Sequence, residues 1–165
     1  MRVFIENLWS LVSENSEVRN ENFEPIFTVK GRAFFSISKK KSIYGRDGAL
    51  LYTVRNNLLD LLFYRVHVTD ADGKRVATVK KSVFDLSKKY KILNTEQQIT
   101  VEGSIFEKGI YIMRGRQEIA HVTVNSSVFS LTRSDSYSLD ADEKDIPFLT
   151  ALVIAIDNLR DRRRR

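Results

Sequence analysis

Five segments of this chain repeat an alternation of apolar and polar residues around the dipeptide Thr-Val. The pairs are Thr28-Val29, Thr53-Val54, Thr78-Val79, Thr100-Val101 and Thr123-Val124. Successive pairs begin 25, 25, 22 and 23 residues apart, and each pair is followed by three mostly polar residues and then two apolar ones. Alternation of this kind is typical of a strand with one buried face, and its near-constant period indicates a repeated structural unit.

The alternation also predicts which side of each strand faces the core, because successive side chains of a strand point to opposite faces. One side is apolar in every unit. We expect it to be buried, and it carries Phe27, Tyr52, Val54, Val79, Val101 and Val124. The other side is polar, and we assign it to solvent; it carries Thr28, Thr53, Thr78 and Thr123.

Turn sequences separate further strand-like runs. Gly45-Arg46-Asp47-Gly48, Asp70-Ala71-Asp72-Gly73 and Arg114-Gly115-Arg116-Gln117 each follow a short β-rich run, as in hairpins. With residues 2–5 and 136–139 added, the repeat predicts about 12 strands. No helix is predicted between these strands, so we expect them to pair antiparallel.

Residues 145–159 follow a different pattern. The segment is apolar on every side from Phe148 to Ile156, and such a helix is either buried or membrane-spanning. The apolar run from Ile146 to Ile156 has 11 residues, short of the roughly 18 that a span needs. Asp145 is a suitable N-cap, and Pro147 suits a first turn. We predict a helix over residues 146–159 inside a closed barrel, since a barrel of more than about eight strands leaves a lumen to fill.

These elements occur together in a known family. The segments FTVKGRAFFSISKK, YGRDGALLYTVRN, VTDADGKRVATVKK and LTALVIAIDNL resemble the LURP-one-related proteins, whose fold is similar to the tubby C-terminal domain and to phospholipid scramblases. The resemblance implies a mainly β protein, a closed antiparallel barrel of about 12 strands enclosing a hydrophobic C-terminal helix. It covers nearly the whole chain and departs most in residues 56–63 and in the arginine tail. We expect one domain over residues 1–161 and a basic tail over residues 162–165.

Composition changes this picture little. The chain has no cysteine, which excludes disulfides and thiolate chemistry and fits a reducing, cytoplasmic location. Its first residues lack the apolar run of a signal peptide. The formal net charge is +6. Four of these charges belong to the arginine tail, so the other 23 basic residues nearly balance the 21 acidic ones.

Basic clusters are the features that point to a partner. They comprise Lys39, Lys40 and Lys41 with Arg46; Lys80 and Lys81 with Lys88 and Lys89; and the tail Arg162, Arg163, Arg164 and Arg165. Such clusters attract polyanions. Lysines near strand ends also protect sheet edges and raise solubility, and this plainer interpretation stays open.

No catalytic or metal-binding constellation is evident, and no cofactor is predicted. The two histidines, His67 and His121, have no nucleophile or ligand at a diagnostic spacing, so we interpret them as structural or solvated side chains. A Ser-His-Asp arrangement assembled by the fold stays open, although no nucleophile elbow supports it. Asp70-Ala71-Asp72-Gly73 begins like a calcium loop, but Lys81 occupies the position that needs a bidentate glutamate. We predict a hairpin turn there.

Three functions are compared. A non-enzymatic module that binds anionic phospholipid head groups, peripheral at a membrane surface, is favoured by the basic clusters and by the resemblance to tubby-like and scramblase proteins. A nucleic-acid-associated regulator is the alternative, although no element that could read bases is visible. An enzyme is the third possibility, and a barrel filled by a helix offers it little interior space.

Overall fold

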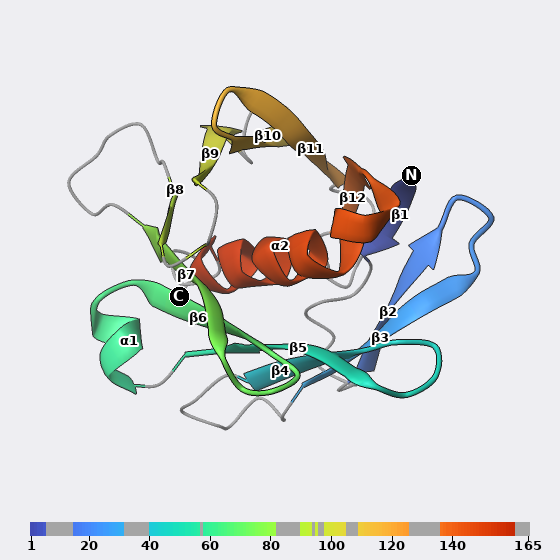
Figure 1. Ribbon diagram of the computed structural model, residues 1–165, viewed down its shortest axis with the longest axis horizontal. Coiled ribbons are helices and arrows are strands. Elements are labelled where there is room, and N and C mark those ends of the chain that lie inside the picture. The colour runs from blue at the N-terminus through green and yellow to red at the C-terminus, as the bar shows by residue number, and fades with distance from the viewer. Residues whose placement is uncertain are drawn as a thin grey trace.

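The structure is a computed structural model, and it describes residues 1–5, 15–31, 40–56, 58–81, 90–93, 95, 98–104, 109–125 and 136–160. Within these residues, twelve strands form a closed antiparallel barrel (Figure 1). The strands are β1 (Arg2–Ile5), β2 (Asn15–Asn20), β3 (Pro25–Gly31), β4 (Lys40–Tyr44), β5 (Leu50–Arg55), β6 (Arg65–Asp70), β7 (Arg75–Lys81), β8 (Tyr90–Leu93), β9 (Ile99–Ser104), β10 (Gly109–Arg114), β11 (Gln117–Asn125) and β12 (Ser136–Ala141).

Each strand pairs with its neighbours along the chain, and β1 closes the barrel by pairing with β12 as well as β2. The hairpin predicted at residues 70–73 is confirmed. The Asp70 carboxylate accepts hydrogen bonds from the backbone N–H groups of Asp72 and Lys74, and Gly73 has a positive φ of 81°. This Asx turn satisfies the carboxylate locally, which explains why the Asp-Ala-Asp-Gly sequence forms a turn.

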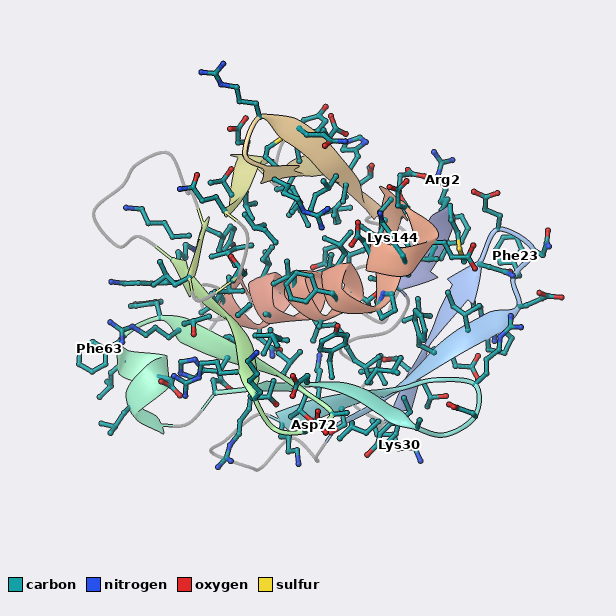
Figure 2. All side chains as sticks on the ribbon, viewed as in Figure 1. Arg2, Phe23, Lys30, Phe63, Asp72 and Lys144 are labelled. Carbon is teal, nitrogen blue, oxygen red and sulfur yellow. The ribbon has the colours of Figure 1, made fainter. Side chains whose placement is uncertain are left out.

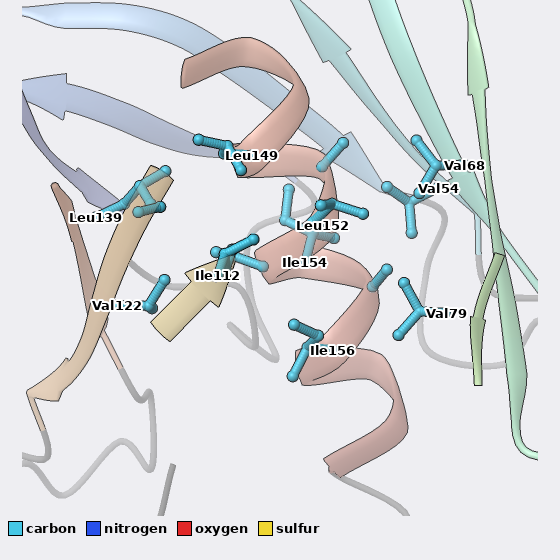
Figure 3. Close-up of a cluster of buried hydrophobic side chains, with 14 of the residues drawn as sticks. Val54, Val68, Val79, Ile112, Val122, Leu139, Leu149, Leu152, Ile154 and Ile156 are labelled. Atoms are coloured by element: carbon cyan, nitrogen blue, oxygen red, sulfur yellow. The ribbon is translucent and has the colours of Figure 1, made fainter. Parts of the chain in front are cut away.

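The predicted central helix is confirmed as α2 (Ile146–Arg160), which follows a 3₁₀ turn, η1 (Glu143–Asp145). Asp145, the expected N-cap, ends that turn, and its carboxylate accepts a hydrogen bond from Arg114 on β10. Leu152 and Ile154 lie on nearly opposite sides of α2, yet both are fully buried. Strand residues therefore surround the helix, and Figure 3 shows Ile112 on one side of it and Val79 on the other.

The predicted strand faces are correct, but the degree of burial differs from the prediction on both faces. Val54, Val79 and Val101 are buried in the core, whereas Phe27, Tyr52 and Val124 are only half-buried. On the outer face, Thr28 and Thr123 are half-buried. Thr53 and Thr78, assigned to solvent, are only 8% and 4% exposed. The Thr53 hydroxyl lies 3.5 Å from that of Ser42, and the Thr78 hydroxyl lies 2.9 Å from His67 Nδ1, so both contact neighbouring outer-face side chains.

A second correction concerns the connection between β5 and β6, where we expected no helix. This connection contains the short helix α1 (Leu58–Leu62). It lies outside the barrel next to β6 (Figure 1). The segment Leu-Leu-Asp-Leu-Leu has no strand alternation, because Asp60 is the only polar residue in it. The five-residue run was too short to be distinguished from the apolar positions of the repeat.

The barrel has two distinct ends. At the first, which we call the α1 end, β5 leads through α1 into β6. The helix α2 also finishes at this end, because Tyr137 at the start of β12 contacts Asp157 in the last turns of α2. At the other, the turn end, the hairpins of residues 45–49 and 71–74 close. Side chains at the α1 end therefore come from the starts of β4, β6, β8 and β12 and from the last residues of β5 and β7.

Candidate functional site

One cation stands on the outer face of each of five neighbouring strands near the α1 end. From β4 to β8 these residues, which we call the cationic strip, are Lys40, Arg55, Arg65, Lys80 and Lys91. Lys40 lies directly opposite Arg55, and Lys80 lies directly opposite both Arg65 and Lys91. Arg55 and Arg65 are diagonal neighbours across β5 and β6. Since paired strands are about 4.8 Å apart, the strip is about 19 Å long.

The strip places like charges face to face, which destabilises a sheet. Four of its residues are exposed and Lys80 is half-buried. Within the described part of the chain, no carboxylate forms an ion pair with any strip residue. Positive potential therefore accumulates along this row, as it does in surfaces that attract anions.

The turn end is organised in the opposite way, because several of its arginines are neutralised within the protein. The pairs are Arg2 with Asp140, Arg19 with Glu17, Arg46 with Glu24, and Arg114 with Asp145. Exposed ion pairs contribute little stability, but they cancel charge locally. These four turn-end arginines therefore differ from the strip residues, for which no such ion pair occurs within the described residues.

The structure divides the basic residues predicted from the sequence. Lys40 and Lys80 belong to the cationic strip. Lys41 and Lys81 fall on the inner face of their strands, where Lys41 is half-buried and Lys81 is only 6% exposed. Arg46 lies at the turn end, where it pairs with Glu24 and donates to a backbone carbonyl, so it is separated from the lysines with which it was grouped. The remaining predicted positions lie outside the described residues: Lys39, Lys88, Lys89 and Arg162–Arg165.

Three strip residues were missed in the sequence. Arg55 and Arg65 are not part of any basic run, so a search for clusters passes over them, and Lys91 is separated by one residue from the predicted pair Lys88 and Lys89. The repeat itself marks one of these positions, because Arg55 directly follows the second Thr-Val pair as Lys80 directly follows the third. Antiparallel pairing places such positions at the same end of the barrel.

The outer face beneath α1 carries a polar relay. His67 on β6 is joined through Nδ1 to the Thr78 hydroxyl on β7 and through Nε2 to the Asp60 carboxylate on α1, both at 2.9 Å. The order hydroxyl, imidazole, carboxylate is that of a hydrolase triad. A nucleophile must meet its substrate, however, and Thr78 is only 4% exposed. The relay therefore explains the burial of Thr78 and joins α1 to the barrel wall.

The other histidine makes a simpler contact. The ring of His121 stacks on that of Tyr111, with centroids 4.6 Å apart and an interplanar angle of 5°. Both histidines thus pack against neighbouring strand residues, as predicted. Among the residues that the structure describes, no group of three or more histidine, aspartate or glutamate side chains could hold a metal ion.

Polar side chains also occur inside the barrel near the end of α2. The Tyr137 hydroxyl donates a hydrogen bond to the Asp157 carboxylate, and both residues are buried. The side-chain amides of Asn56 and Asn158 are buried, and neither has a hydrogen-bond partner in the part of the chain that the structure describes. Such groups destabilise a folded protein. The last turns of the helix, at the α1 end, thus carry two buried polar residues, Asp157 and Asn158, and Thr150 is a further one in its first half.

The closed antiparallel barrel threaded by an apolar C-terminal helix defines a tubby-like barrel protein. The chain belongs to the LURP-one-related family, because the family model matches residues 2–157. It is similar in fold to an Arabidopsis thaliana protein solved by X-ray crystallography, with a TM-score of 0.62 and 17% identity; the match covers 96% of this chain and 91% of the other. No curated protein matches. Among the described residues, no helix has both the length and the apolar character needed to cross a bilayer.

Proposed function

We propose that this protein is a non-enzymatic binding module whose cationic strip docks on anionic phospholipid head groups at the cytoplasmic surface of a membrane. The observation that carries the proposal is the row of five cations on β4–β8, which form no ion pair with any carboxylate of the described residues. A row of like charges is unfavourable in the free protein, and an anionic surface would relieve it. The cytoplasmic leaflet supplies such a surface through its anionic lipids.

The size of the effect follows from the number of cations. A lysine or arginine near an anionic membrane contributes about 1 kcal/mol, so five contribute about 5 kcal/mol before screening. That corresponds to reversible attachment with a Kd of about 0.2 mM, and it should weaken sharply as salt is added. The strip alone therefore suits a peripheral module rather than a permanently anchored one.

A binding role also agrees with the relay beneath α1. The Thr78 hydroxyl is covered by the histidine that would have to activate it, so a substrate has no route to the hydroxyl. The hydrogen bonds of the relay instead suit a structural role, in which they hold α1 against β6. This supports a role in binding rather than in catalysis.

The experiment uses matched pairs of arginines from the two ends of the barrel. Arg55→Gln/Arg65→Gln removes two charges from the strip, and Arg75→Gln/Arg116→Gln removes two exposed charges from the turn end. Binding is measured to phosphatidylcholine vesicles with and without phosphatidylserine. We expect the strip variant to bind anionic vesicles about 30-fold more weakly, from about 2 kcal/mol of lost attraction, and the turn-end variant to bind nearly as the parent does. A third variant without Arg162–Arg165 measures the contribution of the tail separately.

Two results would refute the proposal. One is equal binding of the parent protein to neutral and anionic vesicles, or to neither. The other is an equal loss in both arginine variants, which would show that net charge matters and the strip does not. Tighter binding to a DNA or RNA duplex than to anionic vesicles, at equal phosphate concentration and salt, would favour the nucleic-acid alternative instead.

A further inference from the structure

Exposed apolar side chains gather at α1. Leu59, Leu62 and Phe63 are 64%, 69% and 59% exposed, and they lie within five consecutive residues. Figure 2 shows Phe63 projecting from the edge of the molecule beside α1. The other exposed large hydrophobic side chains in the described residues are dispersed: Met1, Phe23, Leu93 and Tyr111. We call Leu59, Leu62 and Phe63 the apolar tip.

The apolar tip is held in a defined orientation. Leu59 and Leu62 are three residues apart and therefore share one side of α1. Asp60 is directed toward the barrel, where it contacts His67 with 15% side-chain exposure at each partner. The relay thus fastens one side of α1 to the wall and leaves the leucines outward. Phe63 is also fixed locally, because the Arg65 guanidinium lies 5.6 Å from its ring centroid.

The apolar tip and the cationic strip are adjacent. Arg65 belongs to the strip and contacts Phe63, and His67 beneath α1 lies directly opposite Arg55 of the strip. The tip therefore rises from the middle of the row of cations. Apolar residues flanked by cations are typical of surfaces that bind the boundary between lipid head groups and acyl chains.

We propose that Leu59, Leu62 and Phe63 insert into the acyl-chain boundary of an anionic bilayer while the strip contacts the surrounding head groups. This inference rests on the proposed function, and it identifies the partner of the cationic strip as a lipid bilayer rather than a soluble polyanion. Phe63 could stack on an unpaired base, but Leu59 and Leu62 have no planar group for such stacking. Two exposed leucines beside five cations fit a layer that is anionic outside and apolar within.

Insertion can be observed directly because the chain has no cysteine. Leu62→Cys and Phe23→Cys each provide one attachment point for the environment-sensitive dye NBD, the first in the apolar tip and the second at the turn end. With phosphatidylserine-containing vesicles, we expect a blue shift and higher emission from the dye at position 62 and no change at position 23. A dye at position 62 that stays in a water-like environment on bound vesicles would overturn the proposal.

Affinity gives a second, independent measurement. Leu62→Ser/Phe63→Ser removes two side chains of the apolar tip, and Phe23→Ser makes the matching change at a similarly exposed phenylalanine of the turn end. Loss of apolar burial from two side chains should weaken binding to anionic vesicles by at least tenfold in the first variant. The second variant should bind as the parent does. Melting curves of both variants check that each is folded before its binding is compared.

The outcomes separate this inference from the proposed function. If the tip variant binds vesicles like the parent while Arg55→Gln/Arg65→Gln binds weakly, insertion is refuted and head-group binding stands. If the parent fails to bind anionic vesicles, both are refuted. If the tip variant loses binding to a DNA duplex as much as to vesicles, the tip contacts nucleic acid and the bilayer assignment is wrong.

Discussion

Lys80→Glu should make the protein more stable and less able to bind anionic lipid. Lys80 lies directly opposite Arg65 on β6 and Lys91 on β8, so one substitution converts two repulsive pairs into two attractive pairs. Each directly opposed pair is worth about 0.2–1 kcal/mol. Reversing the sign of both should raise the free energy of unfolding by about 0.8–4 kcal/mol, because each pair changes by twice its own value. For a domain of this size, each kcal/mol shifts Tm by about 2–4 °C, which predicts an increase of about 2–16 °C.

The assay is thermal unfolding of the parent, Lys80→Glu and Lys80→Gln at two ionic strengths. Lys80→Gln has nearly the shape of the glutamate variant, and it removes the repulsion without adding attraction, so its Tm should lie between the other two. The Debye length is about 30 Å at 0.01 M salt and about 3 Å at 1 M. The three melting temperatures should therefore converge at high salt.

Binding should change in the opposite direction to stability. Lys80→Glu reverses the charge at the centre of β6–β8, so it should bind phosphatidylserine vesicles more weakly than Lys80→Gln does. A glutamate variant that is less stable than the glutamine variant at low salt, or a difference that persists unchanged at high salt, would contradict the account of the strip as a row of repelling charges.

Three further predictions concern the core. Leu152→Ala should lower the free energy of unfolding by about 2–5 kcal/mol, because a closed barrel collapses only partly onto the cavity; denaturant unfolding measures it. Thr150→Val should leave stability unchanged or raise it by about 1 kcal/mol in the same assay, because the fully buried Thr150 hydroxyl has no hydrogen-bond partner among the described residues. Burial, and then the Asp70 and Asp145 carboxylates, raise the pKa of Tyr52 above its usual value. The Tyr52 hydroxyl therefore loses its proton at a lower pH in the unfolded chain than in the folded protein. The stabilising contribution of Tyr52 is present below pH about 10 and is lost above it. Tyr52→Phe should therefore lose stability less steeply than the parent over that alkaline range.

The barrel and its helix could be predicted because each has a long, regular signal. Five Thr-Val units define strands whose core-facing side is unambiguous, and the all-round apolar stretch of α2 requires a partner on every side. The apolar inner side of the strands needs a buried partner, and the helix needs apolar contacts on every side, so each supplies what the other requires. The predicted limits of the helix, residues 146–159, differ from the observed Ile146–Arg160 by one residue.

The candidate site could be predicted only in part, because it depends on which residues lie opposite each other across strands. Consecutive lysines are conspicuous in a sequence, but alternation sends one member of each pair inward: Lys40 and Lys80 face out, and Lys41 and Lys81 face in. Arg55 and Arg65 are ten residues apart and become diagonal neighbours only through the β5–β6 pairing. Finding them requires the register of the hairpin, which local composition does not contain.

The apolar tip was missed for a related reason. Its residues fall within residues 56–63, where the chain departs most from the LURP-one-related pattern, and short apolar runs are ambiguous between strand, helix and loop. Its function depends on Asp60, whose partner His67 is seven residues away and on another element. Nothing in the sequence of α1 alone indicates that its leucines face solvent.

The strip and the tip should act at different stages of membrane attachment. Electrostatic attraction extends over about a Debye length, whereas apolar contact requires the side chains to enter the bilayer. Charge should therefore govern the rate of association, and apolar burial should govern the rate of dissociation. Arg55→Gln/Arg65→Gln is expected to slow association and to weaken its dependence on salt. Leu62→Ser/Phe63→Ser is expected to associate nearly normally but to dissociate faster. Stopped-flow measurements with labelled vesicles distinguish the two, and a slower association in the tip variant with unchanged dissociation would show that this division of roles is wrong.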